Sequence, residues 1–369
     1  SGALDADGLS RFAQDSDSLS VFAEGTWHHS DSFRTTAGIR YSQDDKSVTK
    51  AGDLRNVGGI LPDGLLAFLY AGPLNLASIH EYALSRDEDH VTGHVNFQWD
   101  ASDNAMLYLN VANGFKAGGF DEDNSLGRLD VAEFEDESVE SIEIGAKILL
   151  GGGRGRLNIA AFSSSYDDVQ VSTFDGNAAF VVGNAAKSKV NGIEADLTYA
   201  ISDNLTFNGA LSILDATYDS FPDAACNVNQ ILAARAATGS RACIQDLQGK
   251  PLQFAPDAAI SLGFSYDAPI TDTLMIGLGV DYNWTDDVNV ALDQDANLLM
   301  ESYGKLNTRI GLSDADGKWS IAIVGKNLTD ERVFTWGNDV PLGSFGFDRT
   351  YFKHIDPPRT FELNMRYNF

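Results

Sequence analysis

Four side chains in one predicted long connection, residues 330–357, carry groups that could bind a small ligand. They are Trp336, Arg349, Tyr351 and His354, which together offer aromatic faces, a guanidinium and an imidazole. Groups of this kind suit a ferric chelate or another aromatic ligand. We therefore identify these four as candidate ligand-binding residues, with packing inside the connection as the alternative interpretation.

Other chemistry-bearing motifs are incomplete. His80-Glu81 has no second histidine at position 84, so it does not make a zinc-protease helix. His28 and His29 are adjacent on a predicted strand and point to opposite faces, so they cannot converge on one metal. The run Asp121–Asp123 could bind calcium weakly, but a solvated acidic loop is the simpler interpretation. With no identifiable triad or carboxylate pair, we expect no catalytic residue, no metal site and no cofactor.

The two cysteines of the chain, Cys226 and Cys243, lie in one predicted connection, residues 217–256. A disulfide between them would fasten a loop that faces an oxidising compartment, and it would contribute about 3 kcal/mol. Two free thiols are the alternative.

Composition limits the partners of this 369-residue chain. Its formal net charge is −27, from 53 acidic and 26 basic residues, which argues against nucleic acid as a partner. No run of 18 apolar residues exists, because the nearest one, 61–77, is broken by Asp63 and Pro73. A β-barrel needs no such run, since its strands span a membrane with about 9–11 residues each. No signal peptide is visible at Ser1, so we expect a processed or truncated N-terminus.

Alternation of apolar and polar residues with period two runs through nearly the whole chain, and the last segment shows it best. Phe361, Leu363, Met365, Tyr367 and Phe369 point one way, and the residues between them are all polar. The same pattern recurs from Phe33, Val91 and Leu274, and weaker copies start near Leu19, Met106, Ile142, Leu157, Ile193, Leu205, Ile260, Leu306 and Trp319. The pattern predicts about 13 strands and no helix.

The predicted connections alternate between short and long. Short turns rich in Gly, Asp, Asn and Ser fall at 30–32, 101–104, 151–155, 202–204, 269–272 and 314–317. Long connections cover roughly 43–89, 118–137, 173–183, 217–256, 287–302 and 330–357. Short turns on one side and long loops on the other are the layout of an outer-membrane barrel.

The polar faces of the strands also favour a membrane barrel. They carry Arg34, Arg40, His94, Glu194, Asp196 and Arg366, whose burial in a dry core would cost several kcal/mol each. A wet lumen satisfies them, and aromatic residues near strand ends fit interfacial girdles. An odd strand number should not close alone, because bacterial barrels have even numbers. We therefore expect residues 1–18 to be the rest of an extracellular loop and an N-terminal part of the barrel to be missing.

Several motifs, in order along the chain, resemble the C-terminal half of TonB-dependent receptors. They are SVFAEG (20–25), TAGIRY (36–41), NGFKAGGF (113–120), ESIEIGAK (140–147), VNGIE (190–194), FAP (254–256), VGKNLTD (324–330) and PRTF (358–361). The resemblance implies that residues 1–369 are one all-β transmembrane domain that supplies roughly strands 10 to 22 of a 22-stranded antiparallel barrel. It also implies a plug domain with a TonB box, neither of which is present in this sequence.

The resemblance further implies a function: TonB-energised uptake of a scarce nutrient complex, most often a ferric siderophore, across the bacterial outer membrane. The implied partners are the TonB energy-coupling complex through the plug, the extracellular ligand, outer-membrane lipid, and the barrel assembly machinery through Phe369. A passive porin-like channel is the main alternative, and it would need more strands but no plug.

Overall fold

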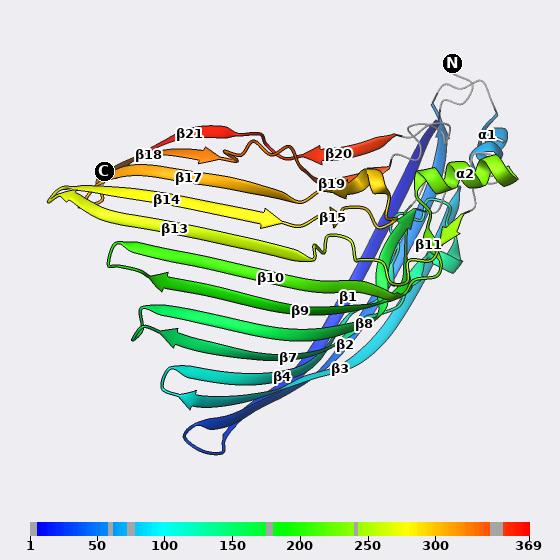
Figure 1. The fold of residues 1–369 in the computed structure, drawn as a ribbon. Helices are drawn as coiled ribbons and strands as arrows, with labels where there is room; N and C mark the ends of the chain where they lie inside the picture. The colour runs from blue at the N-terminus through cyan, green and yellow to red at the C-terminus, as the bar shows by residue number, and fades with distance from the viewer. Residues whose placement is uncertain (1–5, 58–61, 72–77, 175–179, 240–242, 340–349) are drawn as a thin grey trace.

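Thirteen antiparallel strands form one curved sheet, in chain order, in the computed structural model (Figure 1). The structure describes residues 6–57, 62–71, 78–174, 180–239, 243–339 and 350–369. The strands of this sheet are β1 Ala6–His28, β2 Phe33–Asn56, β3 His80–Ser102, β4 Ala105–Lys116, β7 Glu137–Leu150, β8 Gly155–Phe174, β9 Phe180–Ala200, β10 Leu205–Ser220, β13 Ala258–Thr271, β14 Leu274–Thr285, β17 Tyr303–Asp314, β18 Trp319–Lys326 and β21 Thr360–Tyr367. The predicted fold class and strand number are confirmed, and β1 and β21 are the two edges of the described sheet.

The connections are sorted by length between the two ends of the sheet, as predicted. Six tight turns join β1–β2, β3–β4, β7–β8, β9–β10, β13–β14 and β17–β18, and they lie at one end together with the C-terminus (Figure 1). At the other end the long connections fold into two-stranded sheets: β5 Gly119–Phe120 with β6 Glu133–Phe134, β11 Ala224–Ala225 with β12 Ile244–Gln245, β15 Val288–Asn289 with β16 Leu299–Met300, and β19 Phe334–Asp339 with β20 Tyr351–Ile355. We call this end the loop end.

The expectation of no helix is wrong. Two α-helices, α1 Asp63–Ala71 and α2 Val228–Thr238, and two short 3-10 helices, η1 Leu129–Val131 and η2 Ala296–Leu298, lie in the long connections. Asn227 caps α2 in a reciprocal pair with Gln230, and Gly239 ends the helix with a φ of 77°. These capping residues were visible in the sequence. The helix was missed because it has no apolar stripe for periodicity to detect.

The first three strands are longer than predicted. β1 already begins at Ala6, so residues 6–18 belong to a strand and not to a loop, and β2 and β3 fill much of the predicted connection 43–89. The outer faces of these extensions carry aspartates in cross-strand register, Asp17 opposite Asp45 and Asp45 opposite Asp87. The apolar alternation stops there although the strands continue, and this is why the sequence suggested loops.

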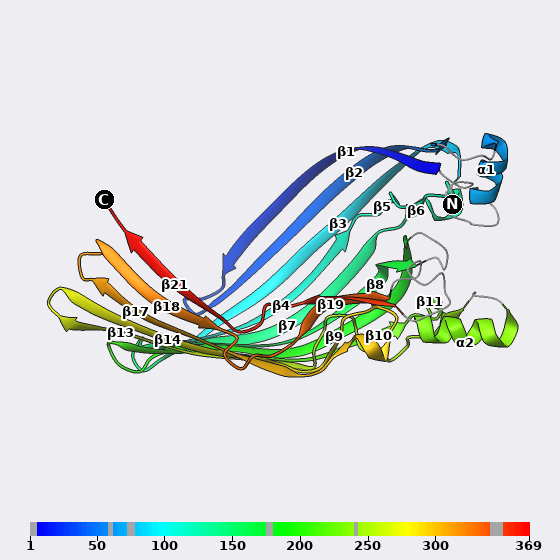
Figure 2. The same cartoon turned by 90° about the horizontal axis from the view of Figure 1, so that it is seen from above.

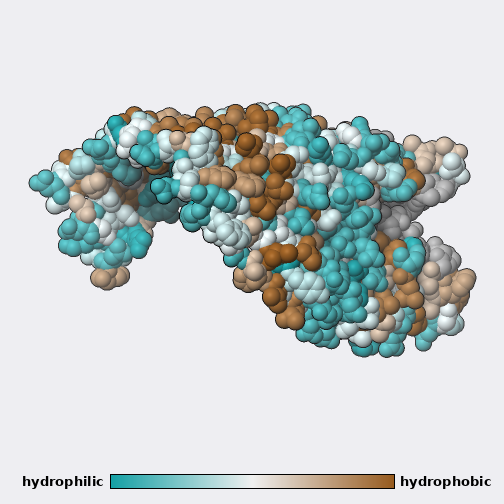
Figure 3. Space-filling view, turned by 90° about the horizontal axis from the view of Figure 1, so that it is seen from below, coloured by the Kyte–Doolittle hydropathy of each residue, from teal (hydrophilic) through white to brown (hydrophobic). Residues whose placement is uncertain are grey.

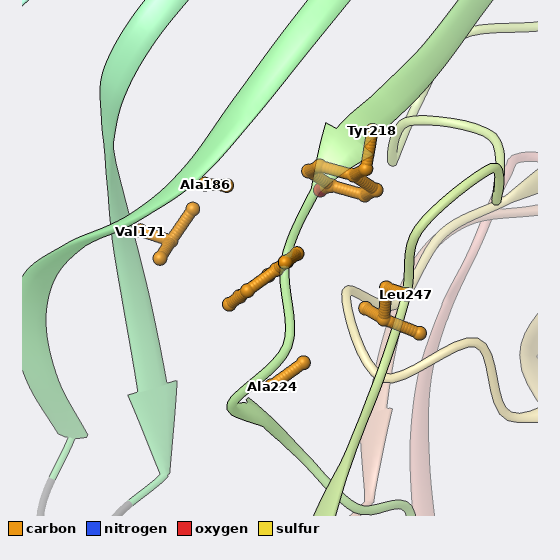
Figure 4. Packing of buried hydrophobic residues seen from close by; sticks show 6 residues of the cluster. Val171, Ala186, Tyr218, Ala224 and Leu247 are labelled. Atoms are coloured by element: carbon orange, nitrogen blue, oxygen red, sulfur yellow. The ribbon is translucent and has the colours of Figure 1, made fainter.

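The sheet is a single curved layer, so its buried apolar clusters lie among the connections at the loop end. Figure 2 shows β1–β3 bending away from the remaining strands, with β5 and β6 inside the trough between them. One cluster joins β8, β9 and β10 to the following connection through Val171, Ala186, Tyr218, Phe221, Ala224 and Leu247 (Figure 4). A second joins two connections, β14–β17 and β18–β21, through Val290, Ala291, Leu298, Met300 and Val333. The loop end is therefore a packed structure.

Candidate functional site

The main sheet has one apolar and one polar face, and its strand register shows which residue lies on which. Large apolar side chains on one face remain exposed, among them Leu19, Val21, Trp27, Ile39, Tyr41, Val91, Trp99, Ile144, Ile193, Phe264, Ile310, Ile323, Leu363 and Met365. Cross-strand neighbours share this face, as with Tyr41 between Val21 and Val91. Figure 3 shows apolar side chains gathered around the middle of the molecule. An extended exposed apolar surface of this kind marks a contact with lipid or protein.

The opposite face, which we call the inner face, is a chain of polar contacts between neighbouring strands. Arg34 donates hydrogen bonds to Gln98 and, at 2.6 Å, to Asp100. Further pairs are Tyr108 with Glu143 at 2.7 Å, Asn158 with Asp196 at 2.6 Å, Asn307 with Asp281 at 2.6 Å and Lys326 with Glu362 at 2.8 Å. Arg34 and Asp196, which were predicted to need a water-filled lumen, therefore also have hydrogen-bond partners on neighbouring strands.

Above the apolar face, β1–β3 continue toward the loop end with polar outer residues. On β2 the last exposed apolar side chain is Tyr41, and the strand runs on to residue 56. At a rise of about 3.4 Å per residue this extension is roughly 50 Å long. The inner side of this extension carries the cations that hold the neighbouring connection, residues 117–136.

Two lysines of β2 hold this connection from one side. Lys46 Nζ donates to the carbonyl oxygen of Gly118, and Lys50 Nζ donates to the carbonyl oxygen of Glu122. Asp121 is buried, and burial raises the pKa of its carboxyl group above the ordinary value; burial also lowers the pKa of Lys50. The interpretation of Asp121–Asp123 as a solvated acidic loop is therefore wrong at Asp121. The cation next to this acidic run in the structure is the ammonium group of Lys50, which extends from β2.

Arg86 of β3, whose side chain is 7% exposed, holds the same connection through its guanidinium group. It donates to the carboxylates of Glu88 and Glu133 at 2.9 Å and of Glu135 at 3.0 Å. A Cβ atom at Gly118 would lie 2.6 Å from Arg86 Nη2, so this glycine of the NGFKAGGF motif permits a close approach of backbone to guanidinium.

A second network ties the other long connections together around Asp295, which is 1% exposed. Its carboxylate accepts hydrogen bonds from the Tyr351 hydroxyl at 2.9 Å, from Asn229 of α2 at 3.1 Å, and from the backbone and side-chain nitrogens of Asn297 at 2.8 Å. Burial, together with the charges of Asp339 and Asp295, raises the pKa of nearby Asp293 to about 6. Three connections thus share one cluster of carboxylates, which we call the aspartate cluster (Asp293, Asp295 and Asp339).

The structure brings two of the four predicted ligand-binding residues together and gives a third a structural contact. Tyr351 packs against the second apolar cluster and bonds to Asp295, so it has a structural contact. Trp336 and His354 are directly opposite each other on β19 and β20, and both are exposed. The Phe352 ring lies 5.6 Å from that of Trp336. Arg349 lies outside the described residues.

In the structure Cys226 and Cys243 form a disulfide, with their Cα atoms 5.6 Å apart. Cys226 follows β11 and Cys243 precedes β12, so the bond closes the base of the segment that contains α2. The side chain of Cys226 is buried.

Comparison with known proteins explains this arrangement of a two-faced sheet and a packed loop end. A family model described as "TonB dependent receptor-like, beta-barrel" matches residues 2–328. The chain belongs to this family. No helix in the described part of this family member is long and apolar enough to cross a membrane.

Solved structures of similar fold include siderophore receptors and a copper transporter. The ferric yersiniabactin uptake receptor FyuA from Yersinia pestis matches with a TM-score of 0.75 at 18% identity, covering 98% of this chain and 47% of that one. The siderophore receptor PiuA from Acinetobacter baumannii matches with a TM-score of 0.69 at 16% identity, over 96% and 44%. The copper transporter OprC matches with a TM-score of 0.60 at 14% identity, over 95% and 47%. The chain therefore spans less than half the length of these receptors.

Sequence reasoning missed one group in this receptor chain that could hold a metal, Glu88, His90 and Asp136. Glu88 and His90 are two residues apart on β3, and such spacing places both on one face of a strand. That part of the signal was available in the sequence. The third member comes from the connection before β7, and only the fold brings it to β3.

Proposed function

We propose that this chain is the C-terminal part of the barrel of a bacterial outer-membrane receptor for a scarce nutrient complex, with a ferric siderophore as the ligand class. Uptake then draws its energy from TonB, through a plug domain that belongs to the same protein. Family membership supports the receptor, and the names of FyuA and PiuA support the ligand class.

The free edges of the sheet support the placement of this chain within a larger barrel. β1 pairs only with β2, and β21 pairs only with β18, so each edge presents unpaired backbone groups along its length in the described structure. An edge of this kind is a template for another strand. We propose that further strands of the same receptor pair with both edges and close the barrel, that the apolar face contacts lipid, and that the exposed Phe369 takes part in barrel assembly.

The observation that carries the ligand proposal is the β19–β20 hairpin. Its side chains Trp336 and Phe352 are 43% and 55% exposed at the loop end, with His354 opposite Trp336. Exposed aromatic rings that are held in contact at one site offer a preformed stacking surface for an aromatic chelate. Tyr351 fixes the start of β20 through its bond to Asp295, so the proposed ligand site is Trp336, Phe352 and His354, with Arg349 as a further candidate.

Binding of a panel of ferric siderophores by the full-length receptor in detergent tests this site. The double variant Trp336→Ala/His354→Ala should weaken binding by roughly 10- to 100-fold, because each aromatic or imidazole contact contributes about 1 kcal/mol or more. The control is Trp27→Ala/His29→Ala, which removes the same residue types at the tight β1–β2 turn, at the end of the sheet opposite the loop end. Both residues are exposed there. Equal affinity in the test variant and the control would refute the hairpin as the ligand site.

A further inference from the structure

One group of side chains that could ligate a metal ion lies apart from the β19–β20 hairpin. Glu88 and His90 of β3 meet Asp136, which directly precedes β7, and one candidate ligand atom from each lies within 4.8 Å of the others. His90 Nε2 is 3.7 Å from Glu88 Oε2, and His90 Nδ1 is 3.8 Å from Asp136 Oδ2. Both distances are too long for hydrogen bonds. The three side chains are therefore gathered without bonding to one another.

Burial makes two members of this group, Glu88 and His90, costly unless an ion or another partner fills the space between the three side chains. The Glu88 side chain is 8% exposed, and its Oε1 atom accepts no hydrogen bond from the described residues; Lys46 Nζ is 3.6 Å away. His90 Nε2 is also buried without a hydrogen-bond partner in the described part of the chain. Buried polar atoms are normally satisfied, and each exception requires an explanation such as an ion.

The orientation of the His90 ring is fixed by packing. The ring stacks on that of Phe115, with centroids 3.7 Å apart and planes 19° from parallel. Because the ring nitrogens lie in the ring plane, this stacking directs them toward the carboxylates at the edges of the ring. The imidazole is thus held between the two carboxylates, with Nε2 nearest Glu88 and Nδ1 nearest Asp136.

The charge around the site leaves room for a divalent cation. In the described part of the chain, the interacting groups are two cations, Lys46 and Arg86, and four carboxylates, Glu88, Glu133, Glu135 and Asp136. With His90 neutral, two positive and four negative charges sum to −2. Arg86 and Lys46 bind Glu88, and no lysine or arginine among the described residues pairs with Asp136. A divalent ion would bring the local sum to zero.

We propose that Glu88, His90 and Asp136 bind a divalent first-row transition-metal ion such as Zn²⁺, and that the ion fastens the segment before β7 to β3. One imidazole nitrogen and two carboxylates form a ligand set that suits zinc and leaves a fourth position for water. At bond lengths of about 2.1 Å, tetrahedral ligands lie about 3.4 Å apart, so binding closes the present distances by side-chain rotation. The alternative to a metal ion is a second proton on the His90 ring, which would let both ring nitrogens donate hydrogen bonds to the two carboxylates.

Calorimetric titration of Zn²⁺ into the chelator-treated full-length receptor in detergent at neutral pH tests the proposal. We expect one Zn²⁺ per chain from this site. His90→Gln and Glu88→Gln should each weaken binding by about 100-fold or more, because loss of an outer-shell partner alone costs 10- to 100-fold. The matched control is His94→Gln, since His94 lies on the same face of β3 but faces one carboxylate, Glu24, at 3.4 Å.

The outcomes separate metal from proton and from misfolding. Binding that is lost in His90→Gln but kept in His94→Gln, with both variants showing the native circular dichroism of the barrel, supports the proposal. Absence of Zn²⁺ binding to the unsubstituted receptor, or equal affinity in His90→Gln, overturns it. An imidazolium signal from His90 at neutral pH by NMR that Zn²⁺ does not displace also overturns it, because the proton is then the occupant. None of these readouts depends on the siderophore.

Discussion

The hydrogen bond between Tyr351 and Asp295 should control how firmly the proposed ligand hairpin is held. Tyr351→Phe removes one of four hydrogen bonds to a carboxylate that is 1% exposed, and it leaves the ring packing unchanged. Hydrogen bonds to charged groups contribute about 1.5–3 kcal/mol. The free energy that opposes local opening of β19–β20 should fall by that amount, which corresponds to roughly 10- to 150-fold faster amide exchange.

Hydrogen exchange followed by mass spectrometry of peptides from β19 and β20 measures this effect in the full-length receptor. The control is Tyr303→Phe, because Tyr303 contacts the same apolar cluster and its hydroxyl has no hydrogen bond to another described residue. Exchange in β19–β20 should change little in the control. If Tyr351→Phe exchanges no faster than Tyr303→Phe, Asp295 does not hold the hairpin, and the role of the aspartate cluster is refuted.

Three further changes test other parts of the loop end. Replacing Cys226 and Cys243 by serine should destabilise the segment containing α2 by about 3 kcal/mol, seen as lost exchange protection there, and unchanged protection would contradict a stabilising disulfide. Gly118→Ala places a Cβ atom 2.6 Å from Arg86 Nη2 and should weaken protection of residues 117–136 by about 1–3 kcal/mol, whereas Gly183→Ala, which meets no atom within 4 Å, should not. Burial raises the pKa of Asp293 from 3.8 to about 6, so the folded loops bind this proton more tightly than the unfolded chain does. Loop stability, read as exchange corrected for intrinsic rates, should therefore be highest below pH 4, fall between pH 4 and 6, and then level off; Asp293→Asn should reduce this dependence, and the part due to Asp339, whose pKa burial also raises, should remain.

The strands of the apolar face could be predicted from the sequence because a lipid-facing strand must alternate. Every outer position from Leu19 to Trp27 or from Phe361 to Tyr367 carries information about the fold. Alternation did not predict the parts of β1–β3 that extend beyond the apolar face toward the loop end. There both sides of β1–β3 face water or charged loops, and Asp17, Asp45 and Asp87 no longer distinguish strand from loop.

The candidate sites were harder to predict than the sheet because they depend on contacts between distant connections. Trp336 and His354 were identified by residue type, and the structure places them opposite each other. Tyr351 was identified by the same reasoning, but its hydroxyl is bonded to Asp295, 56 residues away. Neither this hydrogen bond nor the position of Asp136 beside His90 follows from local pattern.

The most direct test of the receptor proposal is uptake of an iron-loaded siderophore by cells before and after the proton motive force is discharged. The siderophore is the one that the purified receptor binds most tightly, and surface binding and internalised iron are measured separately. The proposal predicts that internalisation stops while surface binding persists, because binding uses the loops and transport uses TonB. Internalisation that continues unchanged would contradict it and would favour a passive channel.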